Sequence, residues 1–394
     1  MTASSQTTSR LAHLDMLRGV AALLVMSGHL RAFVFQNYGA LPEAQGPFVK
    51  AFYFMTGFGA HAVLAFFALS GFLVGGKALL DLREARFTWS GYLLRRLTRL
   101  WLVIVPALAA TYVLDQIGVR LTGGLGYDGH FYDILSSGPK PPGGINQSFV
   151  TLVGNLAFLQ TLAVPVFGSN GPMWSLANEF WYYIVFPLAA WIVLSRAKAA
   201  SRLLGASILV VLAWALPGFL WAGGMVWLAG AAAGWATRTP RLAIARTHLV
   251  ARLSAVAALA AMIALAKAVP SAMSPERFGF LVALILPVLA SMPAPGKLYG
   301  RVSKALSEIS YTLYLSHFPL LMLLAMTLIG ADRLRPGAGA AAAFVAFFAV
   351  AMAWATILWW LFERRTDRLY GLIVTALGQR PRAKPPASTT PIPK

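Results

Sequence analysis

HLDMLRGVAALLVMSGHL, residues 13–30, is apolar enough to enter a membrane, yet it contains Asp15, Arg18 and His29. In an α-helix Arg18 and His29 point the same way, because eleven residues at about 100° each make three turns plus roughly 20°. The two side chains are then about 16 Å apart along the axis, and Asp15 falls within about 40° of the same line. Polar side chains aligned within a membrane helix are costly, so they indicate a functional site.

The whole chain has the composition of a membrane protein. Of its 394 residues 58% are hydrophobic and only 12% are charged, whereas a soluble domain is about 25% charged. Apolar runs of spanning length recur from end to end, which predicts an all-α, polytopic integral-membrane bundle of about ten transmembrane helices. The expected spans are 14–35, 58–80, 98–117, 175–195, 203–217, 219–236, 253–269, 277–292, 306–330 and 339–362.

The distribution of charge predicts the orientation of these helices. The net charge is +20, but the positive residues sit in short loops between spans, which is typical of the positive-inside rule and argues against nucleic acid as a partner. With both termini cytoplasmic, all but eight of the 33 lysines and arginines lie at the cytoplasmic side. The eight exceptions are Arg31, Lys50, Arg120, Lys140, Lys267, Arg277, Arg333 and Arg335.

One apolar segment, 149–166, is ambiguous as a span. If it crossed the membrane, every later loop would change sides and three basic clusters would lie outside. We therefore expect it to be re-entrant or to lie on the surface, within a long non-cytoplasmic loop over 118–174.

The predicted domain organisation is simple. Residues 1–10 form a short cytoplasmic N-terminus, 11–370 a single transmembrane domain, and 371–394 a cytoplasmic tail that is disordered toward its end. The chain has no cysteine, so thiolate catalysis and cysteine metal sites are excluded, and no metal is expected.

The first candidate site combines Arg18, near the inner end of the first span, with His29, toward its outer half. A neutral histidine in a membrane cavity is a suitable general base, because its pKa lies near physiological pH. In the structural alternative, Arg18 reaches the headgroups and pairs with Asp15, while His29 bonds a carbonyl.

Two further motifs follow. Ser70 lies in FFALSGFLVGG (residues 66–76), where small residues permit close packing, and it is a nucleophile only if a base lies within hydrogen-bond reach. Arg95, Arg96 and Arg99 precede the third span. They either anchor the helix at the cytoplasmic face or bind a phosphate, since Arg96 and Arg99 share a face.

Glu179 is a carboxylate in the aromatic segment GPMWSLANEFWYYIVFP (residues 171–187). It either forms an ion pair with an arginine of another helix or acts in the site, orienting His29 or binding an acceptor hydroxyl. Trp174 and Tyr182 belong either to the interfacial belt or to a surface that stacks on a sugar.

His317 is a second intramembrane histidine, in ISYTLYLSHFP (residues 309–319). Tyr311 and Tyr314 share roughly one helix face, which His317 continues. The patch is either structural or part of the site.

Taken together, these motifs resemble membrane-bound acyltransferase family 3, which includes the O-acetyltransferases of bacterial surface polysaccharides. The matching elements are Leu14-Asp15-x-x-Arg18-Gly19, His29, Phe66-Phe-x-x-Ser70-Gly71, Arg96-x-x-Arg99, Trp174-Ser-Leu-x-x-Glu179 and Ser310-Tyr-x-x-Tyr314-Leu-x-His317, in the family's order over about residues 10–370.

The resemblance implies a ten-helix bundle that transfers an acyl group, usually acetyl, from cytoplasmic acyl-CoA to a carbohydrate hydroxyl. Arg18 and His29 match the family's essential pair, Arg96 with Arg99 its second arginine motif, and Glu179 its acidic position. The expected partners are therefore the lipid bilayer, acyl-CoA and a carbohydrate acceptor, and the expected location is the bacterial inner membrane.

The competing interpretation is a transporter or flippase that uses Asp15, Arg18 and His29 as a proton relay. Two features argue against it. The two halves of the chain show no internal repeat, and a second arginine cluster suits a phosphorylated donor better than a relay.

Overall fold

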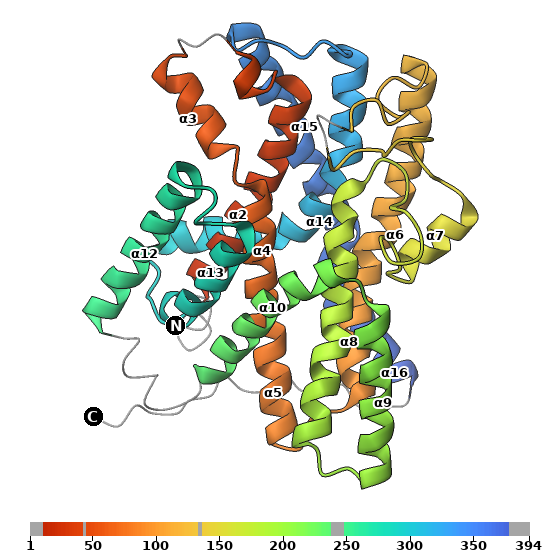
Figure 1. Cartoon of the computed structure of the whole chain (residues 1–394), viewed down its shortest axis with the longest axis vertical. Helices are drawn as coiled ribbons and strands as arrows, with labels where there is room; N and C mark the ends of the chain where they lie inside the picture. Colours follow the sequence, from red (N-terminus) through yellow and green to blue (C-terminus); the bar gives the residue numbers. More distant parts are fainter. Residues whose placement is uncertain (1–10, 42–44, 133–135, 238–247, 378–394) are drawn as a thin grey trace.

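The computed structural model describes residues 11–41, 45–132, 136–237 and 248–377. Within these ranges the chain is helical, with only isolated β-bridges between loops. The all-α, polytopic fold expected from the apolar runs is confirmed. Figure 1 shows α3 and the chain that follows α6 at one end of the molecule, and α5 with the α8–α9 connection at the other.

The elements follow the predicted spans closely. In chain order they are α2 (Ala12–Val34), α3 (Pro47–Met55), α4 (Gly59–Ser70), η2 (Gly71–Gly75), α5 (Gly76–Arg83), α6 (Trp89–Thr122), α7 (Phe149–Leu156), η3 (Gly171–Met173), α8 (Trp174–Leu194), α9 (Ala199–Ala215), α10 (Gly218–Ala236), α12 (Leu249–Ala268), α13 (Pro275–Leu289), α14 (Lys297–Leu328), α15 (Ala338–Leu361), η4 (Glu363–Arg365) and α16 (Thr366–Ala376).

Eight helical segments of the described chain are long and apolar enough to cross a membrane. Each of the ten expected spans coincides with a helix, but two of these helices are short, since α9 has 17 residues and α13 has 15. A perpendicular crossing needs about 20 residues. Ten crossings and two cytoplasmic termini therefore stay predictions, and the residues at both ends of the chain lie outside the described ranges.

The ambiguous segment 149–166 contains one helix, α7, of eight residues. At 1.5 Å per residue this helix is about 12 Å long, far less than the roughly 30 Å of a bilayer core. The chain then turns back on itself, with Thr161 N–H donating to the Val164 carbonyl at 2.8 Å. The segment therefore does not cross as a single helix.

A π-helical turn interrupts the second span. Ser70 ends α4, and η2 carries the chain on into α5. Single π-turns inside longer helices are often found at functional sites, because they redirect the neighbouring side chains. Ser70 is therefore presented by an irregular turn.

Close helix contacts hold the centre of the bundle. α14 lies along α2 and also contacts α6 and α15, while α10 packs on α4, η2 and α13. At the α10 contact, glycine faces backbone: a Cβ on Gly230 would collide with the Ala68 carbonyl oxygen, and one on Gly234 with that of Phe72. Small residues at such crossings let membrane helices approach closely.

Gly230→Ala is expected to reduce the amount of folded protein sharply, because the added methyl group meets backbone that has no rotamer with which to yield. Overpacking of this kind costs about 1–3 kcal/mol. The measurement is the monodisperse fraction after detergent extraction, together with the thermal unfolding temperature. Gly218→Ala, in the same helix but facing open space, is the matched control, and equal behaviour of the two variants would contradict the packing argument.

The C-terminal elements return to the start of α6. α16 contacts α6, and the Arg95 guanidinium lies over the Tyr370 ring at 4.3 Å from its centroid. α16 continues to Ala376, so the domain boundary expected at residue 370 falls inside a helix.

Candidate active site

Two cavities lie inside the bundle and share Val63 and Tyr314 in their walls. The larger, here called the His29 cavity, has a volume of about 800 Å³, and the smaller, the Arg18 pocket, about 90 Å³. The His29 cavity is bounded by α2, the α3–α4 connection, α8, and loop residues within 136–146 and 161–172. The polar residues of the Arg18 pocket are Arg18, Ser70, Arg99, Ser175, Glu179, Tyr311 and Tyr314. Arg18 and His29, which lie along one face of α2, therefore line two adjoining spaces.

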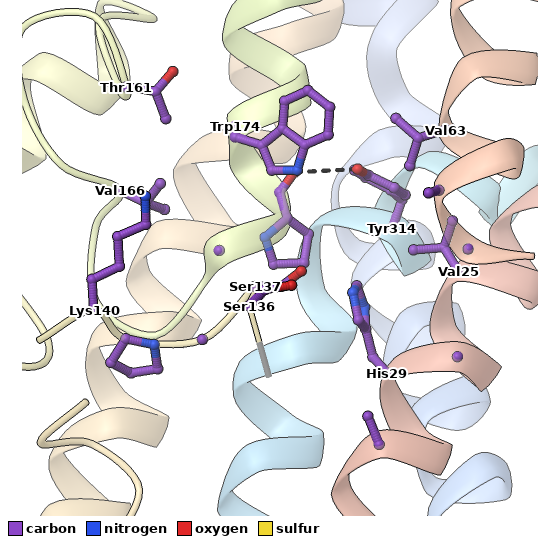
Figure 2. A pocket seen from close by; sticks show the side chains of 18 of the residues that line it. Val25, His29, Val63, Ser136, Ser137, Lys140, Thr161, Val166, Trp174 and Tyr314 are labelled. Carbon is purple, nitrogen blue, oxygen red and sulfur yellow. Dashed lines mark hydrogen bonds between the residues drawn. The ribbon is translucent and has the colours of Figure 1, made fainter. Parts of the chain in front are cut away.

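His29 points into its cavity from α2, opposite the loop that carries Lys140 (Figure 2). Its Nδ1 lies 2.9 Å from Nε2 of His317 on α14, and Nδ1 of His317 lies 2.8 Å from the Leu313 carbonyl oxygen. A carbonyl oxygen only accepts, so Nδ1 of His317 carries a proton and Nε2 of neutral His317 is an acceptor.

The protonation of His29 follows from this chain of hydrogen bonds. His29 donates from Nδ1 to His317, which leaves Nε2 of His29 without a proton; we assign this tautomer from the hydrogen-bond partners. The edge of the Phe318 ring also packs against His29, with centroids 5.0 Å apart. The imidazole is thus oriented as a base, with its second nitrogen held by the buried His317.

In the Arg18 pocket, Glu179 of α8 binds two hydroxyl groups. Ser70 Oγ donates to Glu179 Oε1 at 2.6 Å, and the Tyr183 hydroxyl donates to the same oxygen. Trp227 Nε1 on α10 donates to Ser70 Oγ at 3.1 Å. The base that a serine nucleophile requires is therefore present beside Ser70, supplied by a carboxylate instead of a histidine.

Arg18 and Arg99 bring two positive charges to this pocket. The ion pairs found in the described part of the chain include neither arginine, nor Glu179. Arg99 lies over the Tyr311 ring at 5.8 Å, and both Glu363 and Glu179 are close enough to interact electrostatically with the two arginines, although neither forms an ion pair with them. Because charge is expensive inside a membrane, two guanidinium groups without an ion pair favour a site for negative charge brought by a ligand or developed in a reaction.

The three arginines at the start of α6 do not act as one group. Only Arg99 lines the Arg18 pocket. Arg95 is exposed and stacks on Tyr370, whereas Nε of Arg96 is buried without a hydrogen-bond partner.

The remaining candidates divide between the cavities and the helix contacts around them. Trp174 and Tyr314 both line the His29 cavity (Figure 2). Tyr314 also lines the Arg18 pocket, and its hydroxyl bonds Ser175 at 2.7 Å and the Pro172 carbonyl at 3.2 Å. Asp15 and Tyr182 line neither space. Asp15 accepts from Ser307 of α14 at 3.0 Å, and Tyr182 donates to the Leu220 carbonyl at 2.8 Å, so both hold helices together.

Sequence reasoning missed two contributors, Tyr183 and Trp227. Tyr183 had a detectable signal, because it lies four residues after Glu179 in the same helix, and residues three or four positions apart share a helix face. Trp227 had none, since its contact with Ser70 joins residues 157 positions apart.

Comparison with known proteins gives the family. A family model described as an acyltransferase domain, that of acyltransferase family 3, matches residues 11–363. The chain belongs to acyltransferase family 3. The searches of curated proteins and of solved structures found no match. This acyltransferase is therefore a multi-pass membrane enzyme of the class that the motifs resembled, and family membership favours acyl transfer over transport.

Proposed function

We propose that this acyltransferase moves an acetyl group from cytoplasmic acetyl-CoA to a hydroxyl group of a cell-surface or exopolysaccharide carbohydrate, in the bacterial inner membrane. The observation that carries the proposal is the junction of the two spaces at Tyr314 and Val63. A pocket that contains two guanidinium groups without an ion pair adjoins a cavity that contains an oriented histidine base. Such an arrangement suits a reaction whose two substrates arrive from opposite sides.

The donor is proposed to enter through the Arg18 pocket. Arg95 lies one helical turn, about 6 Å, closer to the start of α6 than Arg99, which suits contacts with the CoA phosphates outside the pocket. Arg18 and Arg99 would then face the thioester oxygen, which becomes negatively charged when the carbonyl is attacked. Arg96, whose Nε has no partner, completes the basic surface along this turn.

The acceptor is proposed to occupy the His29 cavity, where the aromatic face of Trp174 is available to a sugar ring. Nε2 of His29 takes the proton of the acceptor hydroxyl as its oxygen attacks the thioester carbon. The C–S bond breaks, the thiolate receives the proton, and CoA leaves as the free thiol. A covalent route is the alternative, in which Ser70, deprotonated by Glu179, or His29 first carries the acyl group.

The test is acceptor-dependent release of CoA thiol. Purified protein in nanodiscs is mixed with acetyl-CoA, with and without a polysaccharide acceptor, and free thiol is measured. Thiol release that needs the acceptor, with acetate found on the saccharide, supports the proposal. If the protein is reconstituted in vesicles instead, movement of the saccharide across the membrane without thiol release would support transport. Mass spectrometry of protein quenched without acceptor shows whether Ser70 or His29 is acetylated.

His317→Leu is expected to lower kcat by roughly 10²-fold, since His29 loses the acceptor that fixes its tautomer. The KM for the donor should change little, because the donor side of the site is untouched. His317→Gln should retain more activity, as its amide oxygen can accept from Nδ1 of His29. Ser316→Ala, which removes a buried hydroxyl that donates to the Thr312 carbonyl of the same helix, is the control. Equal losses in the Leu and Gln variants would argue against the positioning role.

A further inference from the structure

The described residues that line the His29 cavity carry positive charge and include no carboxylate. Arg31 and Lys140 both line it, and Asp and Glu are absent from the lining over residues 11–41, 45–132, 136–237 and 248–377. Both belong to the eight cations that the positive-inside rule leaves unexplained. A positive charge on the non-cytoplasmic side therefore needs another reason.

Arg31 is the more deeply placed of the two. It lies two residues after His29 in the last turn of α2, and its Nε is buried without a hydrogen-bond partner. No hydrogen bond or ion pair in the described part of the chain engages its guanidinium, whose one aromatic contact is the Tyr53 ring, 5.0 Å from the centroid. An unsatisfied, half-buried arginine at a cavity wall is a ready site for an anion.

Two more of these cations surround Arg31. Nζ of Lys267 donates to the carbonyl of the cavity residue Gly57 at 2.8 Å, and Arg333 donates to the Phe35 carbonyl at 3.1 Å. Both are close enough to Arg31 for their charges to repel it. In the α14–α15 loop, burial lowers the pKa of the Arg333 guanidinium, and Arg31 adds to this effect. Three positive charges, those of Arg31, Lys267 and Arg333, therefore gather at this side of the cavity.

We infer that the acceptor carries an anionic group, a carboxylate or a phosphate, that binds Arg31 and Lys140 while one of its hydroxyl groups reaches Nε2 of His29. Figure 2 shows Lys140 across the cavity from His29, so a sugar ring between them can be held at both ends. This inference rests on the proposed function, which it narrows to acidic acceptors. The anion has two possible sources, a sugar acid or a phosphate-linked sugar.

Binding in the absence of donor tests this directly. Protein in phosphatidylcholine nanodiscs is titrated with a glucuronic-acid-containing tetrasaccharide, a glucose tetrasaccharide of equal length, and glucose 1-phosphate. At least one anionic ligand should bind roughly tenfold or more tightly than the neutral one, and added salt should reduce the difference. The sugar-acid and phosphate arms identify the source. Equal affinity for all three would overturn the inference.

Variants locate the effect. Arg31→Gln and Lys140→Gln should each weaken binding of the anionic ligand by about tenfold with little change for the neutral one, and Arg31→Lys should retain part of the affinity. Because Lys140 is exposed, Lys140→Gln is expected to fold normally, and it tests the anion site even if Arg31→Gln folds poorly. Lys50→Gln is the matched control, an exposed cation on α3 outside the cavity. Unchanged binding in both cavity variants would contradict the assignment.

Acyl transfer is then measured separately, so that the two proposals can fail independently. Transfer to neutral and acidic saccharides at equal rates would leave the proposed function standing and remove the inference. Selective binding of the acidic ligand without thiol release from acetyl-CoA would retain the anion site and remove the proposed function.

Discussion

His29→Ala is expected to lower acyl transfer by at least about 10²-fold, the contribution typical of a positioned general base. The imidazole is aimed into a cavity of about 800 Å³, and its Nε2 is the nitrogen available to an acceptor hydroxyl. Removing it leaves both substrates' binding surfaces in place. The loss should therefore appear in kcat, measured as CoA-thiol release, with donor binding retained.

A histidine outside both spaces supplies the control for this experiment. His61 on α4 bonds the Met273 carbonyl at 3.3 Å and lines neither the His29 cavity nor the Arg18 pocket. His61→Ala should keep transfer close to the wild-type rate, and both variants should elute as monodisperse protein. A folded His29→Ala variant with wild-type transfer would remove His29 from the chemistry.

Arg18→Gln is the second substitution with a large expected effect, a loss of about 10²-fold in kcat. Stabilisation of an oxyanion by a preorganised charge is typically worth 10²–10³ in rate. Arg18 lines the pocket, and no ion pair in the described part of the chain includes it. Arg18→Lys should recover only part of the loss, because an ammonium group lacks the planar fork of the guanidinium. The measurement is kcat and the donor KM at saturating acceptor.

Arg301→Gln tests whether any loss of positive charge has the same consequence. Arg301 is exposed on α14 and lines neither cavity, so its replacement should leave kcat unchanged. A similar decrease in both variants would mean that the general surface charge, and not the position of Arg18, controls the reaction.

The structure gives the pairing of Arg18 and His29 a physical meaning. On one helix the two side chains are about 16 Å apart along the axis, a distance that no single small pocket bridges. Tyr314 lies where their spaces meet and is held by Ser175 and the Pro172 carbonyl. Tyr314 therefore lies in the wall that the two spaces share, and its two partners fix the position of its hydroxyl group.

Much of the fold could be predicted because a bilayer leaves the backbone few choices. Every buried N–H and C=O must find a partner within the segment, so an apolar run of about 20 residues becomes a helix. The segment 149–166 is ambiguous as a span for the same reason. It is apolar, but turns end its helix α7 after eight residues. The π-helical turn after Ser70 left no such mark, as its residues are compatible with an ordinary helix.

Within the site, the sequence by itself determined which residue types stand at membrane depth and which of them share a face of one helix. This was enough to predict that Arg18 and His29 point the same way, because the directions of both side chains are measured about the axis of one helix. The tertiary structure decided every relation between helices. It brought His317 to His29 across 288 positions and Glu179 to Ser70 across 109. It also gave Arg99 and Arg95 different surroundings, since Arg99 lines the Arg18 pocket and Arg95 contacts Tyr370. The physical reason is that helical periodicity leaves free how each helix rotates about its axis, and close packing at small residues such as Gly230 sets that rotation.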